Sequence, residues 1–118
     1  MKAKTNLTML CDFYELTMAN GYFQTGLKDR ICYFDVFYRS VPDKGGFSIA
    51  AGLAQVVEYI QGLSFDEEDV AYLRGKGCFS EEFLQYLLHF EFTGDIWAVP
   101  EGTPVFPGEP ILTVRAPA

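Results

Sequence analysis

The sequence predicts an α+β fold in which helical and strand segments occupy different parts of the chain. Apolar residues recur at helical spacing near the N-terminus and in the middle of the chain, whereas residues 30–40 alternate as strands do. Toward the C-terminus, β-branched segments lie between Pro- and Gly-rich turns. At 118 residues and 49% hydrophobic content, the chain is long enough to bury a core. We therefore expect one domain, residues 1–118, with a small β-sheet and helices.

The segment LCDFYELTMANGYF, from Leu10 to Phe23, predicts a helix that is apolar on more than one side. Thr8 is a candidate N-cap, and Gly26 is a candidate C-terminal stop. Two stripes at helical spacing are expected, one with Leu10, Tyr14, Met18 and Tyr22, the other with Phe13, Leu16, Asn20 and Phe23. Such a helix should lie between two partners. Tyr14 accordingly suits core packing, a partner chain or a flat aromatic ligand.

The next segment, RICYFDVFYRS from Arg30 to Ser40, predicts a strand with two different faces. One face is wholly apolar and the other is mixed, which is typical of a strand between a core and a polar-lined groove. Asp35 and Arg39 share the mixed face. They form either a partly exposed pair of little energetic value or a site where the arginine meets an anion or a partner carboxylate.

The remaining segments predict turns, helices and short strands in succession. VPDKGG at 41–46 is a turn by its Pro, Asp and Gly content. Ser64 and Glu67 have the spacing of a capping box, so we expect a helix to open there. The other expected elements are a strand at 47–51, a helix at 53–60 ended by Gly62, a helix starting at Ser80, and strands at 96–99 and 111–114.

Charge and motif content argue against several classes of function. A net charge of −7 disfavours a nucleic-acid surface, which needs clustered cations. The acidic run 66–69 suits the first turn of a helix better than a metal site, and His89 suits a surface or helix-end position. Neither a phosphate-binding loop, a signal peptide nor a membrane-length apolar run is present. Cys11, Cys32 and Cys78 fit neither disulfides nor zinc, and indicate buried reduced thiols in a cytosolic protein.

Three sequence blocks occur in a fixed order: CDFYELTMANGYF, FDVFYRSVPDKGGFSIAAGL and FTGDIWAVPEGTPVFPGEPILTV. FDEEDVAYLRGKGCFSEEFLQYL lies between the second and the third. Together they resemble the N-terminal region of the nicotinate phosphoribosyltransferase family, and the resemblance covers nearly the whole chain from Leu7 onward.

This resemblance implies a function for the family and a role for a few residues. The family makes nicotinate mononucleotide from nicotinate and phosphoribosyl pyrophosphate, driven by ATP hydrolysis, for NAD synthesis. In its D-x-Y-x-x-T-M motif the tyrosine contacts the nicotinate ring, which implies Tyr14 here, with Asp12 and Thr17 in supporting positions. Arg39 is a weaker candidate for substrate binding. The resemblance also implies a cytoplasmic homodimer in which the N-terminal domain of one subunit caps the active site of the other.

The same resemblance implies that the chemistry lies elsewhere. The family's α/β barrel, its phosphorylated histidine and its phosphate sites lie beyond the segment that this chain matches, and His89 does not match that histidine. We therefore expect an N-terminal piece that is inactive alone and binds no cofactor. The resemblance implies that the full-length family uses ATP and magnesium. Two alternatives stay open: a non-enzymatic interaction module and a fragment of a quinolinate-type phosphoribosyltransferase.

Overall fold

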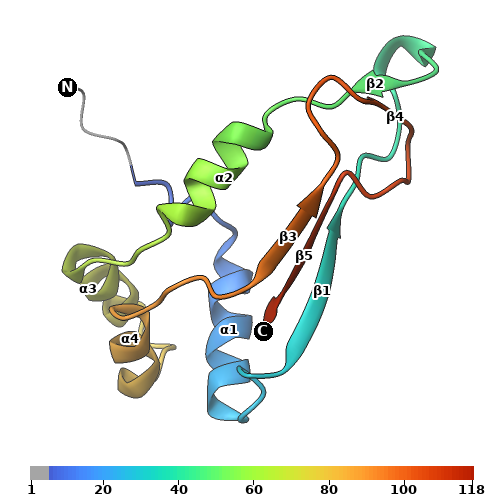
Figure 1. Cartoon of the computed structure of the whole chain (residues 1–118). Coiled ribbons are helices and arrows are strands. Elements are labelled where there is room, and N and C mark those ends of the chain that lie inside the picture. Colours follow the sequence, from blue (N-terminus) through green and yellow to red (C-terminus); the bar gives the residue numbers. More distant parts are fainter. Residues whose placement is uncertain (1–5) are drawn as a thin grey trace. The chain divides into compact units, whose positions relative to one another are not determined.

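The computed structural model describes residues 6–118, which divide into two compact units. The first unit combines the N-terminal part up to Arg30 with Tyr59–Phe92, and the second combines Ile31–Glu58 with Thr93–Pro117. Helices dominate the first unit and strands the second (Figure 1). The predicted α+β class and the order of its elements are therefore confirmed.

The first unit is a small helical cluster built from α1 (Phe13–Gln24), α3 (Glu67–Gly75) and α4 (Glu81–Leu87). Helix α2 (Leu53–Gln61) crosses the boundary between the two units. Apolar residues at helical spacing bring the three helices together because burying them removes apolar surface from water. The core consists of Leu16, Val70, Leu73, Phe83, Leu84 and Leu87.

The helix ends in this unit follow local sequence signals, with two corrections. Helix α1 closes as predicted: Gly26 has φ +75°, and the Leu27 amide donates to the Tyr22 carbonyl at 2.9 Å, which is a Schellman ending. Helix α3, however, is capped by Asp66 and not by Ser64. The Asp66 carboxylate accepts from the amides of Glu68 and Asp69, and the Asp69 side chain accepts from the Asp66 amide.

The predicted N-cap of the first helix is also wrong. Helix α1 begins at Phe13, and Asp12 occupies the N-cap position. Thr8 is instead buried, where its hydroxyl donates to Asn6 Oδ1 at 2.6 Å and accepts from the Ser64 amide at 3.0 Å. This long-range use of the hydroxyl holds the segment before α1 against the α2–α3 connection.

The second unit contains a three-stranded antiparallel sheet in the order β1-β5-β3. Its strands are β1 (Ile31–Val36), β3 (Asp95–Ala98) and β5 (Leu112–Pro117), and β5 lies in the centre. A separate two-stranded ladder pairs β2 (Ser48–Ile49) with β4 (Pro104–Val105). The predicted turn at 41–46 contains a short 3₁₀ segment, η1 (Pro42–Lys44), in which Asp43 and Lys44 both have positive φ.

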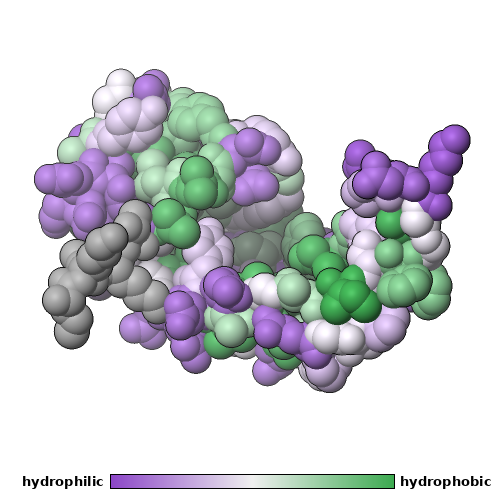
Figure 2. All heavy atoms as spheres, turned by 90° about the horizontal axis from the view of Figure 1, so that it is seen from above, coloured by the Kyte–Doolittle hydropathy of each residue, from purple (hydrophilic) through white to green (hydrophobic). Residues whose placement is uncertain are grey.

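The register gives the three-stranded sheet one apolar and one polar face. Phe34 pairs with Val114, and Val114 with Ile96, so these side chains share a face, while Asp35, Thr113 and Trp97 share the other. The apolar face is not the core face expected for β1, since Phe34 is 65% exposed. Hydrophobic side chains also reach the surface among hydrophilic ones in the space-filling view (Figure 2).

None of the helices within residues 6–118 is both long and apolar enough to span a bilayer.

Candidate functional site

Tyr14 lies in the first turn of α1, on the outward side of the first unit. Its side chain is 59% exposed, and Leu10 and Met18 of the same predicted stripe are exposed too. In the second stripe Leu16 and Asn20 are buried, whereas Phe13 at its start is 46% exposed. The helix is thus apolar on an uncovered side as well as on its core side, as its sequence predicts.

The two residues expected to support Tyr14 occupy defined positions around it. Asp12 is the N-cap of α1, but its carboxylate accepts no capping hydrogen bond. The Thr17 hydroxyl donates to the Tyr14 carbonyl at 2.9 Å, a bond within the helix that leaves the Tyr14 ring unconstrained. The hydrogen bonds of these two side chains therefore do not hold the Tyr14 ring in one direction.

An open pocket of about 430 Å³ lies beside the start of α1, lined by Leu10, Cys11, Asp12, Glu15 and Tyr59. Two carboxylates, a thiol and a phenol make its polar lining acidic. Partial burial, with Glu15 and Asp12 nearby, raises the pKa of the Cys11 thiol. Burial, with Cys11 and Glu15 nearby, likewise raises the pKa of the Tyr59 phenol. The pocket disfavours additional negative charge and therefore suits a neutral or cationic group better than a carboxylate.

The cysteines are less buried than expected. Cys11 and Cys78 are exposed and Cys32 is half-buried, and all three are reduced. The expectation of buried thiols is therefore wrong for two of the three. Within the described part of the chain, no group of three or more His, Cys, Asp and Glu side chains is placed to hold a metal ion.

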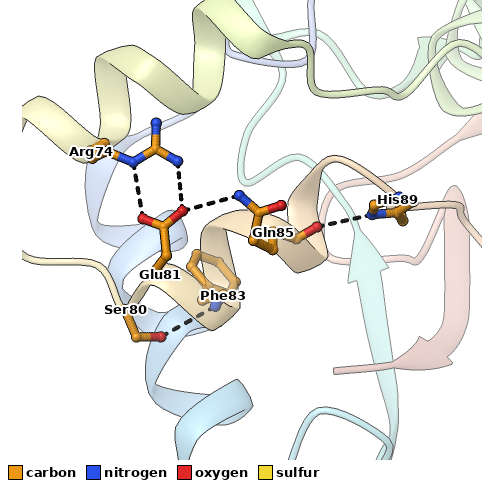
Figure 3. Close-up of polar contacts among 6 residues, drawn as sticks. All are labelled: Arg74, Ser80, Glu81, Phe83, Gln85 and His89. Carbon is orange, nitrogen blue, oxygen red and sulfur yellow. Dashed lines mark hydrogen bonds and ion pairs between the residues drawn. The ribbon is translucent and has the colours of Figure 1, made fainter.

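His89 follows α4, as its place in the sequence suggests. Its side chain is exposed, and Nδ1 lies 3.1 Å from the Gln85 carbonyl oxygen (Figure 3). One nitrogen of the His89 ring is therefore engaged by a carbonyl group of the last turn of α4.

The polar face of the sheet in the second unit carries a network that the sequence pattern did not reveal. Arg115 donates from Nε to the Tyr33 hydroxyl and from Nη1 to Asp95, both at 3.1 Å. The Thr113 hydroxyl donates to Asp35 at 2.6 Å. These contacts join all three strands across one face because the register places the residues opposite one another. In the sequence, these contacts are indicated only by the alternation of residues 112–117 taken together with the alternation in β1.

Asp35 and Arg39 do not form a pair. Asp35 accepts from Thr113, and Arg39 is an exposed residue beyond the end of β1. Another residue missed in the sequence is Glu101, whose Oε1 accepts from the Gly52 amide at 2.9 Å and from the Ala54 amide at 3.4 Å. It caps the start of α2 from a distant loop, where Gly52 has φ +94°.

Comparison with known proteins places these features in a family. The family profile described as nicotinate phosphoribosyltransferase (NAPRTase) N-terminal domain matches residues 9–118. Nicotinate phosphoribosyltransferase pncB2 of Mycobacterium tuberculosis is 46% identical over 109 residues, which are 92% of this chain and 23% of that protein. The Bacillus subtilis nicotinate phosphoribosyltransferase is 34% identical over 112 residues, 95% of this chain and 23% of the relative.

The fold agrees with this comparison. The crystal structure of human nicotinic acid phosphoribosyltransferase superposes with a TM-score of 0.81 at 32% identity, covering 91% of this chain and 22% of the human chain. The chain thus spans under a quarter of the length of these relatives.

Proposed function

We propose a ligand-contacting role for this chain, which belongs to the nicotinate phosphoribosyltransferase family and corresponds to that family's N-terminal domain. The whole protein would transfer a phosphoribosyl group from phosphoribosyl pyrophosphate to nicotinate, with ATP hydrolysis, in the cytoplasm. This chain would supply one side of the nicotinate site, and the remainder of the family's length would supply the reacting groups.

The observation that carries the proposal is the exposed ring of Tyr14 on a helix that is otherwise anchored in a core. An aromatic ring that its own domain leaves uncovered offers a flat surface to a pyridine ring, and such ring contacts contribute about 0.5–1.5 kcal/mol beyond area burial. Asp12 and Thr17 would act only through the geometry of the helix start, and Arg39 is a lesser candidate.

The charge around Tyr14 limits what this chain contributes. The neighbouring pocket is acidic, so the cation that would meet the nicotinate carboxylate has to come from another part of the protein or from a second subunit. The same reasoning assigns the anionic substrates phosphoribosyl pyrophosphate and ATP, together with the magnesium that accompanies their phosphates, to groups outside this chain. We expect the isolated chain to form no nicotinate mononucleotide when it is incubated with nicotinate, phosphoribosyl pyrophosphate, ATP and magnesium.

A chimeric enzyme tests the role of Tyr14. The chain replaces the matched N-terminal segment of the Mycobacterium tuberculosis relative, and steady-state kinetics are measured for each substrate. Tyr14→Ala should raise the KM for nicotinate about ten-fold, which corresponds to about 1.4 kcal/mol, and leave the KM values for phosphoribosyl pyrophosphate and ATP unchanged. Tyr14→Phe should stay close to the parent because it keeps the ring.

Tyr72 is the matched control, since it is a similarly exposed tyrosine on α3 of the same unit. Tyr72→Ala should leave all three KM values unchanged. If Tyr14→Ala raises the three KM values equally, or if Tyr72→Ala has the same effect, Tyr14 does not contact nicotinate.

A further inference from the structure

Three consecutive residues in the loop before α4, Cys78, Phe79 and Ser80, each contact α1. Asn20 of α1 donates from Nδ2 to the Cys78 carbonyl at 3.4 Å. Its Oδ1 accepts from the Ser80 amide and hydroxyl, both at 3.3 Å. Phe79, which lies between Cys78 and Ser80 in the sequence, contacts the other end of α1: its ring meets that of Phe13 edge to face, with centroids 5.7 Å apart.

Asn20 is suited to this place because an amide both donates and accepts. It is 8% exposed, so its polar atoms need partners in the interior, and the loop backbone supplies them on both sides. Ser80 also caps α4, since its hydroxyl accepts from the Phe83 amide (Figure 3). One side chain therefore connects α1 to the first turn of α4.

The two contact points fix how α1 is turned about its axis. Phe13 and Asn20 are seven residues apart, which places them on one face of the helix and about 10 Å apart along it. A helix held at both points by the same loop can neither rotate nor slide freely. Tyr14 follows Phe13 directly, so the direction in which its ring projects depends on this attachment.

We propose that Asn20 is a positioning residue, and that the loop formed by Cys78, Phe79 and Ser80 sets the orientation of Tyr14 toward nicotinate. The clause concerning nicotinate rests on the proposed function, whereas the orientation of Tyr14 can be tested without any substrate.

The first measurement is made on the chain itself, labelled with 3-fluorotyrosine. The fluorine resonance of Tyr14, assigned by its loss in Tyr14→Phe, should shift in Asn20→Leu, in Asn20→Asp and in Phe79→Leu. Asn20→Asp keeps oxygen acceptors for Ser80 but removes the donor to the Cys78 carbonyl, so its shift should be smaller than that of Asn20→Leu. Should Asn20→Leu fail to fold, Asn20→Asp and Phe79→Leu provide the same readout.

Leu73→Ala separates positioning from general loss of stability. Leu73 is fully buried on α3, and its truncation creates a cavity in the core that Leu16 of α1 also enters, without removing the Asn20 hydrogen bonds or the contact between Phe13 and Phe79. It should lower the melting temperature while the Tyr14 resonance stays in place. If that resonance moves as far in Leu73→Ala as in the Asn20 variants, or does not move in either, the positioning role is wrong.

The second measurement uses the chimeric enzyme. Asn20→Asp and Phe79→Leu should raise the KM for nicotinate roughly five-fold with kcat nearly unchanged, since about one hydrogen bond or ring contact is lost from the support of Tyr14. A shifted Tyr14 resonance with an unchanged KM would uphold the positioning of Tyr14 and contradict its contact with nicotinate. An unshifted resonance would overturn the positioning role whatever the kinetics.

Discussion

Glu81 shows how a single side chain links pH to the stability of the helical unit. Its carboxylate accepts two hydrogen bonds from Arg74, at 2.7 and 2.9 Å, and a third from Gln85 at 3.0 Å (Figure 3). Hydrogen bonds from Arg74 and then Gln85 lower the pKa of Glu81 from 4.5 to about 2. The contact joins α3 to α4 at the surface, where solvent screens it, so its contribution to stability is small.

The lowered pKa of Glu81 predicts where on the pH scale this contribution disappears. A carboxyl with a depressed folded-state pKa stabilises the fold fully above its unfolded value and loses that effect as the pH falls through the folded value. The melting temperature of the wild type should therefore exceed that of Glu81→Gln at neutral pH. The difference should shrink from about pH 4.5 to about pH 2.

Glu82 provides the control for the Glu81 prediction. It lies in the same helical turn but outside the Arg74 contact, so Glu82→Gln should keep the pH dependence of the wild type. A difference between wild type and Glu81→Gln that stays constant from pH 7 to pH 2 would contradict the assigned ion pair.

At the scale of elements, the structure identifies which of two neighbouring residues caps α3. Ser64 and Asp66 both have cap-forming side chains, but only Asp66 accepts from the amides of the first turn. Asp66→Ala should lower the free energy of unfolding by about 1 kcal/mol, the usual cost of losing an N-cap. Ser64→Ala should cost less, because its hydroxyl makes only contacts of 3.4 and 3.5 Å. Urea unfolding followed by circular dichroism measures both, and a larger loss for Ser64→Ala would contradict the assignment.

The elements also show how far sequence reasoning reaches. Local signals predicted the glycine ending of α1, the start of a helix at Ser80 and the alternation of β1, because each depends on residues a few positions apart. The start of α1 was misplaced because the Thr8 hydroxyl bonds to the amide of Ser64, which is 56 positions away in the chain. Burial of the apolar face of β1 was mispredicted for the same reason: alternation defines two faces without specifying what covers either.

The candidate site was predictable to a similar degree. The sequence predicts a two-sided helix on which Tyr14 suits core packing, a partner chain or a flat aromatic ligand, and only the resemblance implies nicotinate as that ligand. The attachment of that helix to the loop before α4 was not predicted, because Asn20 is 58 positions from Cys78 and 60 positions from Ser80 in the chain. The contact between Arg115 and Asp95 was not predicted for a comparable reason, since only the strand register brings the two residues together.

At the scale of the whole molecule, the chain leaves much apolar surface uncovered. Phe34 and Val36 are at least half exposed on one face of the three-stranded sheet, and β1 is an edge strand of that sheet. An apolar face next to an open strand edge favours association with another chain. We therefore expect the isolated chain to self-associate, with a weight-average mass in sedimentation that rises with concentration.

Two substitutions on β1 test which surface drives this self-association. Phe34→Thr removes an aromatic ring from the apolar face but keeps a β-branched residue suited to a strand, so it should shift association to higher concentration. Tyr33→Thr is the matched control, because Tyr33 is equally exposed on the opposite, polar face of the same strand. It should change association much less than Phe34→Thr does. A wild-type chain that sediments as a monomer at every concentration, or equal effects of the two substitutions, would show that the apolar face does not drive association.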